Sequence, residues 1–398
     1  MPVISTENKI KIAFVVWTLE GMGGSERVVF DIVRKLNKNR YEIFVLSFKD
    51  GPVRNLYENL GAKVRVFIKR RKIDLNFIKD IRNYLVEKDI DILNPHHLSP
   101  FYCSFLAARR TSAKILFTEH SQWQLEELGL AWKILNKILF RKVDGFVAIS
   151  EQIKRFYLSE LKLRQDRIHL ITNGIDLYRF RKMDHNGKKW ELGFESNDKI
   201  IGMVANIRPE KNHKLLLSAF NEIAKEMKDT HLLLVGFDCM DGRVQEISRK
   251  FEVADRIHFL GMREDVPEIL NILDIFCLTS FHEGLPISVL EAMACEVPVV
   301  GADVLGINEV IKDKENGLLF PLKDERTLIN YLRSLLINDD LRRAMGRRGR
   351  IYVEANYNLE RKMEDYDALF ENLLHHGSGG RQTVAEFSIR SGSSASRK

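Results

Sequence analysis

Two glutamates, Glu283 and Glu291, stand eight residues apart in the segment EGLPISVLE. A carboxylate accepts hydrogen bonds from paired hydroxyls, so the two could hold a sugar at one end and a ribose at the other. Gly284 and Pro286 interrupt the segment, and apolar residues then recur at helical spacing, which predicts a tight turn leading into a helix. The unpaired N–H groups at the start of such a helix favour phosphate or another anion. Alternatively, the first glutamate caps the helix and the second lies on its solvent-exposed face.

The stretch over residues 279–320 resembles the retaining glycosyltransferases of family 4, which have the GT-B fold. The resemblance rests on EGLPISVLE, AMACEVPVV and NEVIKDKENGLLF, and it extends from about residue 10 to about residue 374. In that family the first glutamate of the motif contacts the donor sugar and the second holds the ribose hydroxyls. The resemblance therefore implies these roles for Glu283 and Glu291, and a donor-binding turn made of Gly284, Leu285 and Pro286.

A cationic loop forms the second candidate group, with Arg208 and Lys211 between an apolar strand over residues 200–205 and a helix from residue 212. Two cations beside a helix N-terminus can stabilise the negative charge that builds on a diphosphate leaving group. In a metal-free enzyme they would replace magnesium. The resemblance to GT-B enzymes, which do not need a bound metal for donor activation, implies neither a metal nor another cofactor. The family that this chain resembles typically has an arginine at the position of Asn206, and Arg208 would reach the same phosphate from a shifted position.

A glycine-rich turn, TLEGMGGSE, joins an apolar strand over residues 9–17 to a helix, and Ser25 is a favourable N-cap for that helix. Glu26 occupies the place of the third glycine in the dinucleotide fingerprint, which disfavours an NAD site. By resemblance, Gly23 and Gly24 let the backbone approach the donor phosphate or the acceptor. The alternative is a turn that needs glycine only for a positive φ.

Histidines follow two further predicted strands. In open α/β sheets ligands bind beyond the carboxyl ends of the strands, and His120 stands at such an end after KILFTE. The resemblance implies that His120 contacts the donor sugar. His96 and His97 follow another strand and could line the acceptor side. The triplet DID at residues 89–91 resembles a metal-binding DxD motif, but its place before ILN favours a helix-to-strand loop.

The length of 398 residues exceeds one ordinary core and predicts two domains. Strands alternate with helical stretches, which indicates an α/β protein with doubly wound sheets. The resemblance to GT-B enzymes implies two Rossmann-like domains that face each other across a cleft. We expect an acceptor-binding domain over residues 1–176, a nucleotide-sugar-binding domain over 177–355 and a helix over 356–374 that returns to the first domain. Residues 375–398 read as a disordered or artificially added tail.

The bulk composition predicts a cytoplasmic protein. No apolar run reaches the length of a membrane span, and the N-terminal apolar core over residues 12–17 is shorter than that of a signal peptide. The four cysteines lack a paired spacing, which fits a reducing compartment and provides neither a zinc site nor a disulfide framework.

Positive charge is concentrated in the first half of the chain. Residues 1–176 carry 30 Lys and Arg against 20 Asp and Glu, whereas the remainder carries 32 against 35. Nucleic acid is disfavoured because aromatic residues are not interleaved with the basic ones. An anionic membrane surface is preferred, since a helix over residues 132–142 would place Trp132, Leu135, Ile138 and Leu139 on one face beside basic residues. The alternative is a core-packed helix with a basic edge.

The resemblance implies a retaining hexosyltransferase that does not depend on a metal. It would move a sugar from a nucleotide donor, UDP in preference to GDP, to a glycan or polyprenyl-linked acceptor during polysaccharide or glycolipid synthesis. Such an enzyme would work at the inner face of the membrane. Two alternatives remain open: a sugar-nucleotide epimerase of the same fold and a non-catalytic nucleotide-sugar-binding protein.

Overall fold

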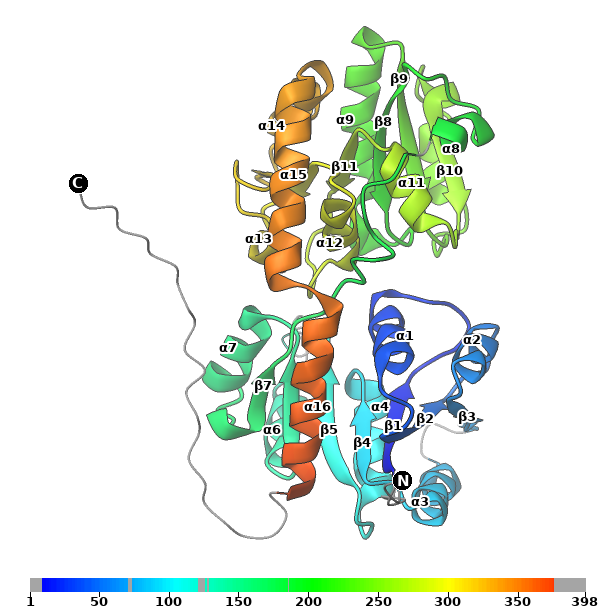
Figure 1. Cartoon of the computed structure of the whole chain (residues 1–398), viewed down its shortest axis with the longest axis vertical. Coiled ribbons are helices and arrows are strands. Elements are labelled where there is room, and N and C mark those ends of the chain that lie inside the picture. Colours follow the sequence, from blue (N-terminus) through cyan, green and yellow to red (C-terminus); the bar gives the residue numbers. More distant parts are fainter. Residues whose placement is uncertain (1–8, 71–73, 121–125, 127–128, 185, 376–398) are drawn as a thin grey trace, which may run out of the picture.

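The computed structural model describes residues 9–70, 74–120, 126, 129–184 and 186–375 (Figure 1). The predicted tail after residue 375 and part of the basic run over residues 70–72 lie outside these ranges. Within them the chain forms two α/β domains, each built on a parallel sheet. The two domains lie one above the other in Figure 1, as the sequence predicts. This arrangement is the two-domain Rossmann-like architecture of the GT-B fold.

The first domain is built on a sheet whose described strands run in the order β3-β2-β1-β4-β5-β6-β7, all parallel. Side chains of the central strands are buried, which explains why these strands are continuous apolar runs. The strands are β1 (Ile10–Val16), β2 (Tyr41–Ser47), β3 (Lys63–Val66), β4 (Ile92–Pro95), β5 (Lys114–Glu119), β6 (Gly145–Ala148) and β7 (Ile168–Leu170). The helices are α1 (Gly24–Lys35), α2 (Val53–Asn59), α3 (Leu75–Lys88), α4 (Leu98–Ala108), α6 (Leu130–Phe140) and α7 (Glu151–Ser159), with a 3-10 turn over Gln165–Arg167.

The second domain repeats the plan with the described strands in the order β10-β9-β8-β11-β12-β13, again all parallel. These strands are β8 (Lys199–Val204), β9 (Thr230–Val235), β10 (Ile257–Gly261), β11 (Ile275–Leu278), β12 (Val299–Ala302) and β13 (Leu318–Phe320). The helices are α8 (Asn186–Glu191), α9 (His213–Glu226), α10 (Arg243–Ser248), α11 (Val266–Ile272), α12 (Ile287–Ala294), α13 (Ile307–Val310), α14 (Glu325–Ile337) and α15 (Asp339–Asn356), with 3-10 turns at Pro209–Lys211 and Ala254–Arg256.

Each sheet has one place where the strand order reverses. In the first sheet it lies between β1 and β4, and in the second between β8 and β11. A crevice opens at the carboxyl ends of the strands at such a switch point. The glycine turn, the histidines after β4, the cationic loop after β8 and the glutamate turn after β11 all follow one of these four strands. The topology therefore places most of the predicted site residues at the two switch points.

The chain crosses between the domains twice, and the two crossings lie against each other. Ile175 on the outward crossing forms a parallel β-bridge with the return crossing. Its N–H donates to the Tyr357 carbonyl at 2.7 Å. The N–H of Leu359 donates in turn to the Ile175 carbonyl at 3.1 Å. A Cβ at Gly174 would lie 2.5 Å from the Leu359 Cα, so only glycine permits this close approach.

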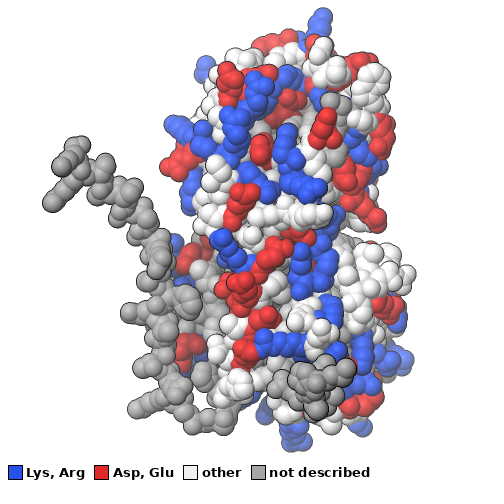
Figure 2. Space-filling view, in the orientation of Figure 1, with Lys and Arg blue, Asp and Glu red and all other residues white. Residues whose placement is uncertain are grey.

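The last helix, α16 (Leu359–His375), returns to the first domain, and in Figure 1 it continues the line of α15 downward. The rings of Tyr41 on β2 and Phe370 on α16 pack edge to face with 5.9 Å between centroids. Lys35 pairs with Glu360 at 2.9 Å, and Arg40 pairs with Glu371. Figure 2 shows acidic side chains gathered over the middle of this face, where α16 meets the first domain. The predicted return of the final helix is confirmed.

The start of α1 differs from the prediction in one respect. Its N-cap is Gly23 rather than Ser25, because the helix begins one residue before the serine. The Ser25 hydroxyl donates instead to the Glu26 carboxylate at 2.9 Å. Gly23 has a φ of −80°, so a requirement for positive φ does not explain the glycine at this position.

Helix α6 exposes most of the apolar face that the sequence predicted. Trp132 and Ile138 are each about half exposed and Leu135 is also exposed, whereas the helix buries Asn136 and Phe140. Tyr102 contacts the buried face, since its hydroxyl donates to the side-chain oxygen of Asn136 at 2.9 Å. A core-packed helix was the alternative for this apolar stripe, and the structure packs only Leu139 of the four predicted residues against the core. Over the described part of the chain, no helix is both long and apolar enough to cross a membrane.

Candidate active site

The glutamate turn of the second domain touches the end of β5 in the first domain. Gly284 lies against the backbone of His120, and a Cβ at this glycine would come within 1.8 Å of the His120 carbonyl oxygen. Any larger residue would therefore push the two domains apart here. A small cavity beside this contact has walls from both domains, including Ser150 and Gln152 on one side and Glu283 on the other. The glutamate turn of the second domain and His120 of the first domain thus meet at one place.

Glu283 and Lys211 form an ion pair in this cleft. The Lys211 ammonium donates to the Glu283 Oε1 at 2.6 Å, and the Ser280 hydroxyl donates to the same oxygen at 2.6 Å. The Glu283 side chain is 11% exposed and that of Lys211 is 22% exposed, so solvent screens the pair only weakly. Since β8 and β11 are neighbours in the sheet, the loops that follow them bring these two residues together.

Hydrogen bonds between those loops fix the lysine. The Thr279 hydroxyl donates to the carbonyls of Lys211 and Asn212 at 3.1 and 3.0 Å. The N–H of Phe281 donates to the Glu210 carbonyl at 2.8 Å. The segment after β11 therefore holds the backbone of the cationic loop at three points and sets the position of the Lys211 side chain.

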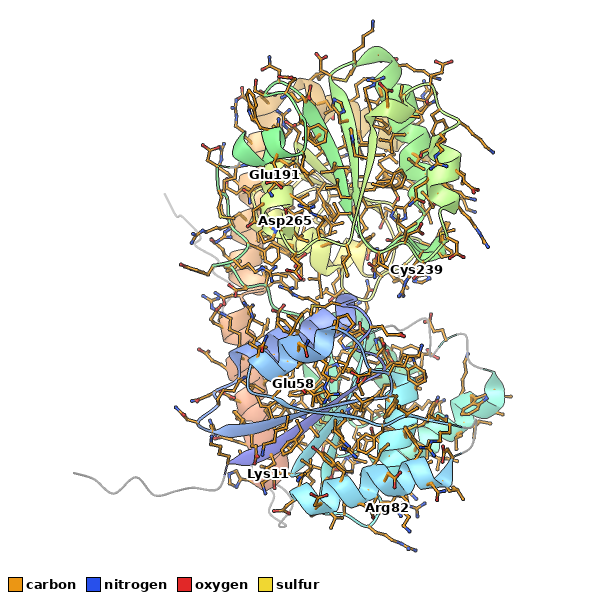
Figure 3. All side chains as sticks on the ribbon, turned by 90° about the vertical axis from the view of Figure 1, so that its right-hand side faces the viewer. Lys11, Glu58, Arg82, Glu191, Cys239 and Asp265 are labelled. Atoms are coloured by element: carbon orange, nitrogen blue, oxygen red, sulfur yellow. The ribbon has the colours of Figure 1, made fainter. Side chains whose placement is uncertain are left out.

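Arg208 does not join this pair. Its Nε contacts the Cys239 sulfur at 3.4 Å, and its guanidinium lies 3.9 Å from the Glu210 carboxylate. Figure 3 shows Cys239 at the end of the second domain that faces the first domain. The arginine side chain is half exposed and lies on the same loop as Lys211. Of the two predicted cations, the structure brings only Lys211 into direct contact with Glu283.

Glu291 lies inside the protein, one helix length from the turn. It is 8% exposed, which contradicts the alternative of a solvent-exposed helix face. Burial raises the pKa of its carboxyl to about 7, although the charges of Arg27 on α1 and of Arg179 act in the opposite direction. Helix α12 begins after Pro286, and no side chain caps the first N–H groups of this helix.

The glycine turn presents the start of another helix. Helix α1 begins at Gly24 with Gly23 as its N-cap, and no side chain caps it. The influence of Arg27 on the Glu291 carboxyl shows that the first turn of α1 lies near α12. Both glycine residues therefore lie at the start of α1 in the first domain, and their role in binding the donor phosphate or the acceptor stays a prediction.

Three histidines form one cluster at the ends of β4 and β5. His96 Nδ1 lies 2.7 Å from His120 Nε2, and His96 Nε2 lies 3.1 Å from the Asn94 side-chain oxygen. His97 Nδ1 contacts the Glu119 carboxylate at 2.9 Å. The predicted donor-sugar histidine and the two predicted acceptor-side histidines are therefore in contact. Sequence reasoning gave no role to Asn94 or to Glu119, and their only signal was their place at strand ends.

Burial and charge act differently on these rings. Burial holds the pKa of His120 well below its ordinary value, and it lowers the pKa of His96 to about 3. Burial acts in the same direction on His97, but the Glu119 carboxylate outweighs it and raises the pKa of His97 above the ordinary value. The cluster therefore contains two neutral rings beside one ring that is paired with a carboxylate.

A contact between the domains that the sequence analysis missed centres on Glu309. Its carboxylate accepts hydrogen bonds from the N–H groups of Glu151 and Gln152 at 2.7 and 3.3 Å, at the start of α7. The Gln152 side chain donates to Asn308 at 3.1 Å and accepts from the N–H of Gly306 at 3.1 Å. A carboxylate at a helix N-terminus is favourable electrostatically. The partners are more than 150 residues apart, so spacing could not reveal the contact.

Comparisons with known proteins agree with this architecture. The family model "Glycosyltransferase Family 4" matches residues 22–179, and the model "Glycosyl transferases group 1" matches residues 184–352. Together these two models account for both domains. The chain is a family 4 glycosyltransferase of the GT-B fold.

Relatives of this glycosyltransferase match most of its length. An N-acetyl-alpha-D-glucosaminyl L-malate synthase of Bacillus anthracis is 28% identical, over 94% of this chain and 100% of the relative. A UDP-Gal:alpha-D-GlcNAc-diphosphoundecaprenol alpha-1,3-galactosyltransferase of Escherichia coli is 24% identical, over 93% of this chain and 99% of the relative. The solved structure of Anabaena Alr3699/HepE with UDP-glucose superposes with a TM-score of 0.81 at 20% identity, over 91% of this chain and 100% of that chain.

The triplet DID of the glycosyltransferase is a structural junction. Asp89 ends α3 in the left-handed conformation, and Asp91 accepts a hydrogen bond from the N–H of Lys11 at 2.8 Å. This is the helix-to-strand loop that the sequence favoured. The residues that the structure describes contain no group of three or more His, Cys, Asp or Glu side chains able to hold a metal ion.

Proposed function

We propose that this glycosyltransferase moves a hexose from a UDP-sugar to a glycan or polyprenyl-linked acceptor, with retention of the anomeric configuration and without a bound metal. The observation that carries the proposal is the contact of Lys211 with Glu283 at the turn before α12. The two side chains suit the two parts of a sugar diphosphate, since a carboxylate accepts hydrogen bonds from hydroxyls and an ammonium pairs with phosphate.

In the proposed reaction the bond between the sugar C1 and the β-phosphate oxygen breaks, and a bond between C1 and the acceptor oxygen forms on the same face. The proton of the acceptor hydroxyl passes to the departing phosphate. Lys211 and Arg208, with the N–H groups at the starts of α1 and α12, stabilise the charge that builds on that phosphate. Glu283 and His120 orient the sugar, and Glu291 holds the ribose hydroxyls.

The choice of donor and acceptor rests on the relatives. The Escherichia coli relative is named for a UDP-Gal donor, and the Anabaena structures contain UDP and UDP-glucose. That relative and a Campylobacter jejuni relative, 29% identical, are both named for acceptors linked to diphospho-undecaprenol. A lipid-linked acceptor would require the enzyme to reach a membrane surface from the cytoplasm. The exposed apolar and basic side chains of α6 in the first domain suit that contact.

Turnover of UDP-glucose, UDP-galactose and UDP-N-acetylglucosamine tests the proposal, with water as the acceptor and release of UDP as the readout. In Glu283→Gln we expect UDP release to fall at least about a hundredfold, because the sugar loses its orienting carboxylate. Glu222→Gln is the matched control, since Glu222 is exposed and pairs only with Lys225 and Asn221 on α9 among the described residues.

Three outcomes would contradict the proposal. Undiminished UDP release in Glu283→Gln would refute the role of this glutamate. Conversion of the sugar to its epimer would favour an epimerase. Release of the sugar with the opposite anomeric configuration, read by proton NMR before mutarotation, would refute retention.

A further inference from the structure

Asn94, His96 and His120 form a chain of three hydrogen-bonded side chains behind the proposed donor-sugar site. All three are buried, and they come from the carboxyl ends of β4 and β5. The rings of His96 and His120 lie 5.0 Å apart between centroids and 23° from parallel. Because each link joins one donor to one acceptor, the first link determines where the hydrogens of the others lie.

The orientation of the Asn94 amide is fixed from the sheet. Its nitrogen donates to the backbone carbonyl of Leu116 on β5, and it also lies 3.0 Å from the Thr118 hydroxyl. A backbone carbonyl can only accept, so the amide nitrogen must point there and the amide oxygen must point to His96. That oxygen can only accept as well. His96 therefore carries its hydrogen on Nε2, at 3.1 Å from the Asn94 oxygen.

The state of His96 then decides the state of His120. His96 is buried, and burial together with the neighbouring His97 lowers the pKa of its ring to about 3. His96 is therefore neutral and its Nδ1 is a bare acceptor. The contact of 2.7 Å with His120 requires a hydrogen, which must come from His120 Nε2. His120 then has no hydrogen on Nδ1.

We infer that Asn94 and His96 are positioning residues that lock His120 in the Nε2–H tautomer, so that its Nδ1 can only accept a hydrogen bond from the donor substrate. Among the described residues, none forms a hydrogen bond with this Nδ1. The inference rests on the proposed function only in placing the donor sugar at His120. It gives the histidine a definite chemical role: it accepts a hydrogen bond from a sugar hydroxyl, and it neither protonates nor donates to the donor.

Nitrogen-15 NMR of the full-length protein with labelled histidines tests the tautomer without any substrate. Imidazole nitrogens with and without a hydrogen have well-separated shifts, and His120→Gln assigns the signals of this ring. At pH 7.5 we expect a protonated Nε2 and an unprotonated Nδ1. A hydrogen on Nδ1, either alone or together with one on Nε2, would overturn the inference.

Two substitutions at His96 separate a positioning role from a packing role. In His96→Gln the amide can donate to Asn94 and accept from His120, so we expect the Nε2–H tautomer to persist and UDP release to stay within about threefold of the native rate. In His96→Phe the acceptor is lost, and we expect both tautomers of His120 and at least a tenfold loss of UDP release. An unchanged tautomer in His96→Phe would overturn the inference. Should the native protein release no UDP from any donor, the proposed function fails, and the NMR result still decides the tautomer.

Discussion

Lys211 and Glu283 neutralise each other across 2.6 Å in a weakly solvated cleft. An unpaired charge in such a place is costly, so each partner must keep an opposite charge or several hydrogen bonds when the other turns away. A sugar diphosphate meets both needs at once, because phosphate can pair with the lysine while sugar hydroxyls donate to the glutamate. At the scale of the residue, this ion pair suits the proposed substrate, which has one charged part and one hydroxylated part.

If Glu291 holds the ribose as proposed, its buried carboxyl should make nucleotide binding depend on pH. Its pKa of about 7 means that near neutral pH the group is partly protonated, and only the ionised form accepts from both ribose hydroxyls. We expect the Kd of UDP to fall about tenfold between pH 6 and pH 8, because the ionised fraction of a carboxyl with a pKa of about 7 rises about tenfold over that range. Isothermal titration of the native protein and of Glu291→Gln checks this. The phosphate ionises equally in both, so an identical pH dependence would contradict the role of Glu291.

The raised pKa of Glu291 affects the stability of the fold in the opposite direction from nucleotide binding. The folded pKa is raised above the ordinary value of 4.5, so the folded state holds its proton to higher pH than the unfolded chain. The contribution of Glu291 to the free energy of unfolding is therefore fully present below about pH 4.5 and is lost as the pH rises through about 7. Nucleotide binding and unfolding should thus respond to this carboxyl with opposite signs.

At the scale of the element, apolar runs and the glycine and proline residues that end them allowed most strands and helices to be predicted. The run before β11, the turn with Gly284 and Pro286 and the helix after it appear in the structure as expected. Local rules failed at α1, where Ser25 was a good cap by type but stands inside the helix. The chemical motif could be predicted because its residues lie on one turn and one helix.

Partners that lie far apart in the chain were beyond sequence reasoning. Glu309 and the start of α7 are joined across the domain interface, and Asn94 gains its role only through a neighbouring strand. The direct contact of Lys211 with Glu283 likewise depends on the order of β8 and β11 in the sheet. Nothing in residue type or spacing reports that order.

Helix α6 gives the prediction that belongs to this scale. Its exposed apolar side chains lie beside exposed basic ones, such as Lys133 and Arg141, a combination that favours an anionic bilayer surface. We expect the protein to sediment with vesicles that contain phosphatidylglycerol but not with phosphatidylcholine alone. Trp132→Ala combined with Ile138→Ser should reduce the bound fraction at least about fivefold, and added salt should weaken binding.

The matched control for this experiment lies on the second domain. Ile337 is an exposed apolar residue at the end of α14, and its replacement by serine removes a similar surface from the opposite domain. Equal loss of vesicle binding in this control would mean that exposed apolar surface of any kind is responsible. Undiminished binding after the α6 substitutions would contradict the assignment to this helix.

At the scale of the whole molecule, the donor cleft exists because two domains are held face to face. The paired crossings at Ile175 and Tyr357, the return of α16 and the Glu309 contact with α7 all join the same two bodies. The tight approach of Gly284 to His120 joins these two bodies as well. A nucleotide-sugar that touches both domains would add its own contacts to this set, so its binding should stabilise the molecule against unfolding.

Thermal unfolding with UDP, GDP and ADP, each with and without an attached sugar, tests this central claim most directly. A ligand at a hundred times its Kd stabilises the folded state by about 2.7 kcal/mol, which corresponds to a rise of several degrees in Tm. We expect UDP and one UDP-sugar to raise the Tm, and Lys211→Ala to remove most of that rise. A shift with GDP or ADP in place of UDP would contradict the proposed donor, and no shift with any nucleotide would contradict a nucleotide-sugar site in this cleft.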